Sequence, residues 1–246
     1  MTPPAIDVTD LSFRYPDGTI ALDHVNLRVD AGEHVAVLGP NGAGKTTLAL
    51  HLNGILRANS GRVHVTGLPV VKANLGEVRR RVGIVFQDPD DQLFMPTVRD
   101  DVAFGPANLG LRGAELDRRV EDALGAVGLL GHGDRTPHHL SFGQRRRAAL
   151  ATVLAMRPEV LVLDEPSSNL DPVARRELAE LLRTLPQAVL IVTHDLPYAL
   201  ELCARAVIMN DGRIVADGPT RTILRDAELM RANRLELPPG YDIDRA

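Results

Sequence analysis

Residues 35–47 read Val35-Ala36-Val37-Leu38-Gly39-Pro40-Asn41-Gly42-Ala43-Gly44-Lys45-Thr46-Thr47, an apolar run of strand length followed at once by a glycine-rich loop. The loop matches the pattern Gly-x-x-x-x-Gly-Lys-Ser/Thr and leads into residues 48–52, which have helical character. In this strand–loop–helix context the pattern binds phosphate, because backbone N–H groups and the positive end of the helix point into the loop. The stretch therefore predicts a nucleotide-binding α/β fold.

Three more apolar runs of strand length follow, at residues 82–86, 160–163 and 189–192, each ending in a polar turn. Such runs are typical of parallel strands that are buried on both faces. Residues 97–156 instead show helical periodicity with glycine breaks, which predicts a helical insertion. Residues 6–29 alternate in polarity around a turn, which predicts antiparallel strands beside the main sheet.

The length and composition fit one large globular unit. The chain has 246 residues, of which 44% are hydrophobic and 24% charged, and this is enough apolar material to bury a core. We expect one domain over residues 1–232, with the helical stretch 97–156 inserted in it. Residues 233–246 contain two prolines and a glycine in a row and are expected to form a loose C-terminal tail.

Charge and cysteine content narrow the function classes. The net charge of −4 provides no broad basic field, so nucleic acid is not an expected partner. The single cysteine, Cys203, cannot form an intrachain disulfide and fits a reducing compartment. The first residues lack a secretory-signal pattern, and no apolar run approaches the roughly 18 residues that a membrane span needs. Any membrane role is therefore expected to come through a partner.

The glycine-rich loop supplies the first candidate ATP-binding residues. Lys45 would place positive charge between the β- and γ-phosphates, and the Thr46 hydroxyl can ligate Mg²⁺. Lys72 is the only other lysine among the 28 basic residues, which favours a site at Lys45 that needs a compact ammonium group. A purely structural turn is the alternative. The candidate residues of the loop are Gly39, Pro40, Asn41, Gly42, Ala43, Gly44, Lys45, Thr46 and Thr47.

Two carboxylates, Asp164 and Glu165, follow the apolar run 160–163 directly. Ligands of open α/β sheets bind beyond the carboxyl ends of the strands, so both acids should project towards the phosphate site. Asp164 would hold Mg²⁺, directly or through water, and Glu165 would accept a proton from the attacking water. An acid pair that only complements a helix N-terminus is the alternative.

Gln87 and His194 end two further apolar runs. An amide can contact Mg²⁺ or its bound water, and an imidazole can reach the γ-phosphate or orient the water beside the catalytic acid. Either residue alone would usually be an ordinary loop residue. Together with the loop they give predicted catalytic residues and predicted Mg²⁺ ligands: catalytic Glu165, His194 and Lys45, and Thr46, Gln87 and Asp164 for the metal.

A third motif, Leu140-Ser141-Phe142-Gly143-Gln144, precedes three arginines and a helical apolar run. With the loop, Gln87, the acid pair, the segment Ser167-Ser168-Asn169-Leu170-Asp171 and His194, it completes a motif order that resembles the ATP-binding-cassette (ABC) ATPases over residues 6–219. The resemblance implies an α/β P-loop NTPase fold of ABC type. Such a fold has a RecA-like parallel sheet core, an N-terminal antiparallel β subdomain and a helical subdomain.

The resemblance also implies that the chain works in pairs. In that family the Ser-Gly-Gln segment opens a helix that caps the γ-phosphate of ATP held by the other subunit. One chain offers one loop and one signature, so two sites need two cassettes face to face, in a homodimer or with a paralogue. Phe142 departs from the usual glycine, which loosens the prediction of how this backbone approaches phosphate. The residues implied to contact ATP in trans are Ser141, Gly143, Gln144 and Asp171.

Tyr15 stands where the family stacks an aromatic ring on adenine, an interaction worth on the order of 1–3 kcal/mol. A half-buried strand tyrosine is the alternative. The three arginines after Gln144 are expected to form a solvated or salt-bridged helix face.

A finer resemblance lies in residues 86–94, Phe-Gln-Asp-Pro-Asp-Asp-Gln-Leu-Phe, and in residues 100–111. Both look like the ATPases of energy-coupling-factor importers, including the cobalt and nickel group. That family implies a transmembrane coupling subunit, a substrate-capture subunit and a peripheral place on the cytoplasmic face of the cell membrane. Of the substrates transported by this family, the resemblance favours cobalt or nickel ions over vitamins. A soluble ABC ATPase outside transport and a binding module without turnover are alternatives of other classes.

Two charged groups complete the predictions. Five acids near the start of the helical insertion are expected to receive basic side chains of the membrane partner, with a solvated acidic loop as the alternative. Three histidines before the signature lack convincing ligand companions and are expected to be loop residues rather than a metal site. These residues are Asp88, Asp90, Asp91, Asp100 and Asp101, and His132, His138 and His139.

Overall fold

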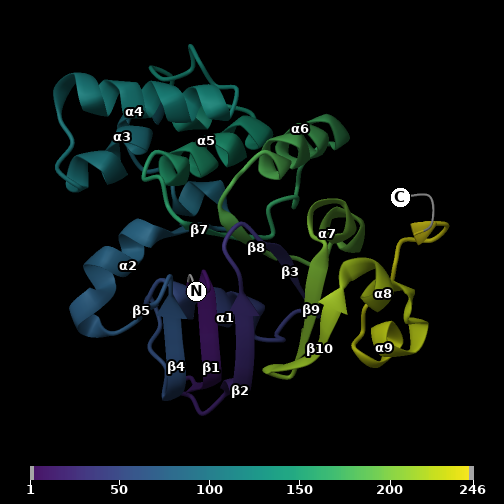
Figure 1. Cartoon of the computed structure of the whole chain (residues 1–246). Coiled ribbons are helices and arrows are strands. Elements are labelled where there is room, and N and C mark those ends of the chain that lie inside the picture. Colours follow the sequence, from purple (N-terminus) through teal and green to yellow (C-terminus); the bar gives the residue numbers. More distant parts are fainter. Residues whose placement is uncertain (1–2, 244–246) are drawn as a thin grey trace.

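The computed structural model describes residues 3–243, which form two β-sheets with helices around them (Figure 1). The first sheet has the strand order β2-β1-β4-β5, and the second has the order β10-β9-β3-β8-β7-β6. The strands are β1 (Ile6–Arg14), β2 (Ile20–Val29), β3 (His34–Leu38), β4 (Ser60–Val65), β5 (Leu68–Pro69), β6 (Val82–Val85), β7 (Val160–Asp164), β8 (Ala188–Val192), β9 (Arg205–Asn210) and β10 (Arg213–Pro219).

The second sheet is parallel except at β10, which pairs antiparallel to β9. The predicted apolar runs form its strands β3, β6, β7 and β8. Every residue of β7 and β8 is buried, as expected of strands covered on both faces. The first sheet is antiparallel, which confirms the expected N-terminal antiparallel strands. Strands β4, β5, β9 and β10 were not predicted.

Helices cover both faces of the second sheet and gather in one lobe beyond β6. They are α1 (Lys45–Leu52), α2 (Leu75–Arg81), α3 (Val98–Asn108), α4 (Gly113–Ala126), α5 (Phe142–Leu154), α6 (Pro172–Arg183), α7 (Leu196–Leu202), α8 (Thr220–Arg225) and α9 (Ala227–Ala232). Helices α3, α4 and α5 form the lobe at the top of Figure 1 and occupy the span predicted for the helical insertion.

Alternate residues of the central strands point to two different cores. On β7, Leu161 and Leu163 join a core shared with the helical lobe and helices α6 to α9. Val160 and Val162 join a second core, shared with α1 and the first sheet. The parallel sheet therefore holds the two subdomains together, and the predicted ABC-type fold class is confirmed.

The C-terminal residues follow α9 closely. Leu235 is buried against the main core, and Leu237 and Ile243 pack beside it. The predicted boundary between residues 232 and 233 stays a prediction, and residues 244–246 of the tail lie outside the described part of the chain. No helix within residues 3–243 is long and apolar enough to cross a membrane.

Candidate functional site

The glycine-rich loop joins β3 to α1 through a turn that requires glycine. Gly44, the residue before α1, has φ 98°, and a Cβ there would lie 2.3 Å from the carbonyl oxygen of Ala21. Gly42 also has a positive φ, 82°, but a Cβ there would meet no atom within 4 Å. The loop thus packs tightly against β2 on one side and is open on the other, where a ligand can approach its backbone.

A pocket of about 320 Å³ opens beside this loop. It brings together most of the predicted site residues and adds three that the sequence did not point to, Thr19, Ile20 and Ala21, which follow the turn after Tyr15. Gly39 and Pro40 form the start of the loop and do not line the pocket. The predicted residues that line the pocket are Tyr15, Asn41, Gly42, Ala43, Gly44, Lys45, Thr46, Thr47, Gln87, Asp164 and Glu165.

Lys45 is folded back on its own loop. Its Nζ donates to the carbonyl oxygens of Gly39, at 2.7 Å, and Pro40, at 3.0 Å. The side chain is buried, and this burial lowers the pKa of Lys45, while the nearby carboxylates of Glu165 and Asp164 act in the opposite direction. The ammonium group therefore lies at the base of the pocket, between the loop and the two acids.

Asp164 and Thr46 meet at the carboxyl end of β7, where the Thr46 hydroxyl donates to Asp164 Oδ2 at 2.9 Å. Burial raises the pKa of Asp164 and the charge of Glu165 adds to this, whereas the Thr46 hydroxyl and Lys45 lower it. Gln87 lines the same pocket. These are oxygen donors of the kind that Mg²⁺ prefers.

The arrangement fits a magnesium ion bound together with phosphate. Mg²⁺ is usually held by one or two protein oxygens plus phosphate and water oxygens rather than by an all-protein cage. Within residues 3–243 no group of three or more histidine, cysteine, aspartate or glutamate side chains could hold a metal ion. The three histidines before the signature, His132, His138 and His139, form no such cluster within the described residues.

Glu165 is held in a strained turn directly after β7. It has φ 46°, and its backbone N–H donates to the carbonyl oxygen of Val192 on β8 at 2.8 Å. Its Oε2 accepts from the Thr193 hydroxyl at 3.0 Å, and its Oε1 accepts from the backbone N–H of His194 at 3.1 Å. The His194 Nδ1 lies 2.7 Å from the same Oε1. Left-handed non-glycine residues concentrate at functional sites, and here the turn aims a buried carboxylate at His194.

His194 lies beside Glu165 rather than in the pocket wall, and 64% of its side chain is exposed. Because its Nδ1 faces a carboxylate, that nitrogen carries a proton in the hydrogen bond, and its Nε2 is the nitrogen left for other partners. The two predicted catalytic residues, which follow β7 and β8, are therefore in contact.

Asp195 ties this site to neighbouring segments and was missed by the sequence. Its carboxylate accepts from the Ser167 hydroxyl at 3.0 Å and from Arg175 Nε and Nη2, both at 3.1 Å. It also caps α7 through the N–H of Tyr198. The available signal was an aspartate two residues before Pro197, at the position directly before a helix that begins with Leu196-Pro197, a pattern typical of N-caps.

Tyr15 packs at the outer wall of the pocket. Its hydroxyl lies 3.1 Å from the Thr47 hydroxyl, and its ring meets Phe13 edge to face with 4.9 Å between ring centres. These two contacts fix the ring beside the glycine-rich loop, and its role as the adenine contact stays a prediction.

The predicted trans residues lie apart from this pocket. Ser141 caps α5 in a reciprocal pair of hydrogen bonds with Gln144, at 2.9 and 3.2 Å. Asp171 caps α6 through two backbone N–H groups. A Cβ on Gly143 would lie 2.9 Å from that of Ala174, so α5 and α6 approach closely. None of these four predicted residues lines the pocket of its own chain.

The arginines after the signature do not all lie on a solvated face. Arg145 pairs with Asp90 at 3.3 Å and Arg147 with Glu177 at 2.7 Å, as expected. Arg146 is only 1% exposed, so the expectation is wrong for this residue. Its Nη1 and Nη2 donate instead to the carbonyl oxygens of Phe86, at 3.1 Å, and Ser168, at 3.2 Å, and its Nε has no hydrogen-bond partner within residues 3–243.

The acidic group at the start of the helical lobe is also not uniformly exposed. Asp101 is 2% exposed, and its Oδ1 accepts from the backbone N–H groups of Phe94 and Met95. Burial is the largest cause that raises the pKa of Asp101. The expectation that Asp101 receives a partner's side chain is therefore wrong, because the carboxylate is committed to the turn before α3.

Comparison with known proteins supports one family. A family model described as ABC transporter matches residues 22–168. An ABC transporter ATP-binding protein of Streptomyces coelicolor is 68% identical over 98% of this chain and 92% of its own length. The energy-coupling factor transporter ATP-binding protein EcfA of Methanothermobacter thermautotrophicus is 49% identical over 97% of this chain and 78% of its own.

Solved structures agree with this assignment. The structure of cbiO1 from Clostridium perfringens, described as part of the ABC transporter complex cbiONQ, has a TM-score of 0.84 and 39% identity over 96% of both chains. The dimeric ATP-binding cassette MJ0796 bound to ADP and Pi has a TM-score of 0.78 and 27% identity over 87% of this chain and 98% of the other. The chain belongs to the ATP-binding proteins of ABC transporters, close to the energy-coupling-factor ATPases, and hydrolyses ATP for transport.

Proposed function

We propose that this chain is the ATP-hydrolysing subunit of an energy-coupling-factor importer. One observation carries the catalytic part: a buried carboxylate, Glu165, is held by Thr193 and His194 beside a pocket that also contains Lys45 and Asp164. The likeness to EcfA and cbiO1 supports the importer class. It also favours transport over the alternative of a soluble cassette outside transport.

The proposed binding roles follow from the geometry of the pocket. The loop N–H groups and Lys45 bind the phosphates of ATP, and Lys45 exchanges its hydrogen bonds to the loop carbonyls for bonds to phosphate oxygen. Tyr15 stacks on adenine. Thr46, Asp164 and Gln87 hold Mg²⁺, which when bound neutralises charge on the β- and γ-phosphates.

The proposed catalytic roles belong to Glu165 and His194. Glu165 accepts the proton of the attacking water, because its carboxylate is the buried acceptor next to the phosphate site. His194, hydrogen-bonded to that carboxylate through Nδ1, is oriented so that Nε2 can donate to the γ-phosphate. The strained backbone at Glu165 costs local stability, and this supports a catalytic role in which the direction of the side chain is important.

A second cassette completes the site in this proposal. Ser141, Gly143, Gln144 and Asp171 lie outside the pocket of their own chain, on the N-terminal ends of α5 and α6. Those helix ends suit an anion, so they serve ATP bound to a partner cassette. The dimeric form of MJ0796 supports this pairing, and either a second copy or a paralogue would satisfy the geometry.

The transmembrane coupling subunit is proposed to contact the start of the helical lobe. Phe94 and Phe104 are 65% and 44% exposed and meet edge to face, with 5.0 Å between ring centres. Asp91, three residues before Phe94, is exposed and has no side-chain contact described within residues 3–243, whereas Asp90 is engaged by Arg145. An exposed aromatic pair next to free acidic charge suits an apolar helix flanked by basic side chains.

The cargo is proposed to be cobalt or nickel ions, with a vitamin as the second candidate. The resemblance of residues 86–94 and 100–111 to the cobalt and nickel group supports this order. The cargo is selected by a separate substrate-capture subunit, so the residues of this chain do not contact it. In this proposal the chain lies on the cytoplasmic face of the membrane and is attached only through its partners.

Copurification of the tagged chain from membranes of its source, followed by mass spectrometry, tests the importer class. We expect a multi-span coupling subunit and a capture subunit, whose identity narrows the cargo. Asp91→Lys with Phe94→Asp should abolish this recovery without changing ATP binding. Asp134→Lys, a fully exposed acid elsewhere on the lobe, serves as the control. Recovery as a soluble dimer with only cytosolic partners would overturn the transport partners proposed here.

A further inference from the structure

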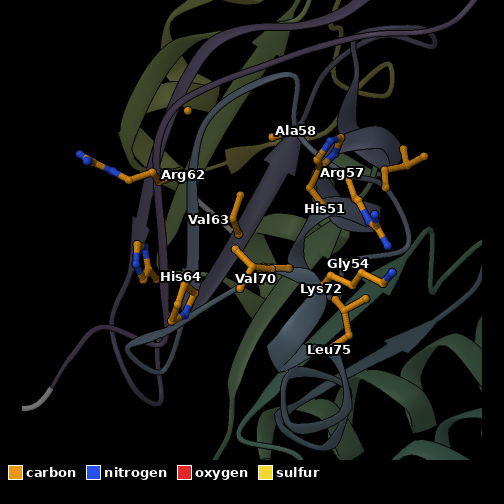
Figure 2. A pocket seen from close by; sticks show the side chains of 14 residues that line it. His51, Gly54, Arg57, Ala58, Arg62, Val63, His64, Val70, Lys72 and Leu75 are labelled. Carbon is orange, nitrogen blue, oxygen red and sulfur yellow. The ribbon is translucent and has the colours of Figure 1, made fainter.

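A second cavity, of about 420 Å³, lies beside the edge of β4, between the segment that follows α1 and the start of α2 (Figure 2). Its walls are largely apolar and include Leu56, Val63, Val70 and Leu75. None of its lining residues lines the nucleotide pocket. Its size and apolar walls are those of small-molecule sites, which typically add a few placed polar groups.

The rim of this cavity carries positive charge without compensating acid. Arg57 and Lys72 are exposed there, and neither makes an ion pair or side-chain hydrogen bond within the described residues. No aspartate or glutamate is among the residues that line the cavity. In Figure 2 the nitrogen ends of Arg57 and Lys72 lie on the same side of the cavity, whereas Arg62 points away from it.

These two charges lie close to a charge that is paired. Arg81, on the neighbouring α2, forms an ion pair with Glu77, whereas Arg57 and Lys72 have no carboxylate beside them in the cavity lining. Lys72 is the one lysine of the chain besides Lys45. Two free cations above an apolar hollow are complementary to an anion whose remaining surface is apolar.

His51 adds an unsatisfied polar atom to the wall. The ring is 1% exposed, and its Nδ1 lies 2.8 Å from the carbonyl oxygen of Thr47. A carbonyl oxygen can only accept, so Nδ1 carries the hydrogen and Nε2 is left as an acceptor. Nε2 makes no hydrogen bond of good geometry within residues 3–243. Burial lowers the pKa of His51, and the backbone groups of Thr47 and Arg57 act in the opposite direction, so the ring also lies near the backbone of Arg57. His51 therefore adds one weakly satisfied polar edge to an otherwise apolar part of the wall.

We propose that this cavity binds a small molecule with an apolar body and one anionic group, a carboxylate or phosphate, and that Arg57 and Lys72 hold the anionic group. The apolar body enters between Leu56, Val70 and Leu75 and removes their half-exposed surface from water. A soluble metabolite and a single-chain membrane amphiphile share this chemistry. A hollow of about 420 Å³ has room for one small molecule, which favours the soluble molecule over a membrane surface.

Fluorescence titration with 2-naphthoate tests the proposal on the full chain. The chain is first saturated with ADP, so that the glycine-rich loop is occupied and cannot bind the probe. We expect saturable binding that weakens at least about tenfold in the Arg57→Glu, Lys72→Glu double variant, which reverses both rim charges. Val70→Trp, which fills the cavity without changing charge, should remove binding.

The matched control is the Arg79→Glu, Arg80→Glu double variant, which reverses two exposed charges on α2 outside the cavity lining and should bind 2-naphthoate as the native chain does. The neutral 2-naphthalenemethanol should bind at least about tenfold more weakly than 2-naphthoate. Equal binding by the rim variant and the native chain would overturn the proposal. Binding to phosphatidylglycerol vesicles but not to 2-naphthoate would overturn it as well, because the occupant would then be a membrane surface.

Discussion

Replacing Glu165 by glutamine separates the chemistry of this carboxylate from its place in the fold. The substitution keeps the side-chain shape and one acceptor oxygen, so the Thr193 hydroxyl and the backbone N–H of His194 can still find partners. It removes the negative charge and the ability to take a proton. Because the nearest polar contacts are all short and local, we expect little change in the free energy of unfolding.

The size of the effect follows from the role of a general base. Such a group contributes about 10²–10⁴ in rate, which corresponds to roughly 2.7–5.4 kcal/mol of the activation free energy. Turnover by Glu165→Gln should therefore fall by about 10²–10⁴, while ATP binding is retained. Unhydrolysed ATP should then hold two cassettes together, because the signature residues of each chain contact the nucleotide of the other.

Steady-state phosphate release, ATP binding by equilibrium titration and size-exclusion chromatography with ATP measure these three outcomes. Glu159→Gln is the matched control, because Glu159 immediately precedes the opposite end of β7 and is 56% exposed beside Arg81. It should leave turnover unchanged. Normal hydrolysis by Glu165→Gln would refute the assignment, and loss of ATP binding would show that the charge acts on the ground state instead.

Three further changes test the packing around the site. A left-handed alanine costs roughly 1–2 kcal/mol, and Gly44→Ala should destabilise the fold by more than this because its Cβ would lie 2.3 Å from a carbonyl oxygen. Gly42→Ala, whose Cβ would meet no atom, should cost only the backbone strain of a left-handed alanine. Equal urea midpoints for the two variants would contradict this. Arg146→Met should cost about 2 kcal/mol or more in unfolding free energy, since two part-buried carbonyl oxygens lose their donor, and Arg145→Met should cost less, about 1 kcal/mol, since it loses one hydrogen bond to a carbonyl oxygen and a partly exposed ion pair; the reverse order would be inconsistent with the contacts. The pKa of Asp101 is raised in the folded chain, so its contribution to stability is full below about pH 3.8 and is lost as pH rises through the folded-state pKa; the stability of Asp101→Asn should therefore increase relative to the native chain as pH rises above about 3.8 in urea titrations, and parallel curves would exclude this linkage.

The sequence could predict the site well because parallel strands deliver their carboxyl ends to one edge. Gln87, Asp164 and His194 each follow a run of apolar residues, so strand assignment alone places them together. The signature residues could be placed on a helix end but not relative to the pocket. These residues are separated from the pocket of their own chain by the positions of α5 and α6 in the folded structure, which the sequence pattern does not reveal.

What the sequence could not predict depends on folded contacts that the pattern of neighbouring residues does not reveal. Asp101 reads as one of five neighbouring acids, yet two backbone N–H groups of the preceding turn bury it. Arg146 reads as the middle of a charged triplet, and its burial depends on carbonyl oxygens 60 and 22 residues away. Strand β9 follows a short helix and begins and ends in polar residues, so its hydrophobic pattern did not predict a strand.

Phe86, the residue before Gln87, is connected to helix α5 by two sets of hydrogen bonds. The Gln92 side chain accepts from the N–H of Phe86 at 3.3 Å and donates to the carbonyl oxygen of Ala149 on α5 at 2.8 Å. Arg146, also on α5, donates to the carbonyl oxygen of Phe86. A displacement of Gln87 on nucleotide binding therefore has a hydrogen-bonded route to α5, whose first turn carries Ser141 and Gln144. In the proposed pair that turn contacts the partner's nucleotide, so nucleotide binding in one pocket would change the geometry of the other. Weakening the Gln92 contacts should therefore reduce the coupling between the two sites while each site still binds ATP.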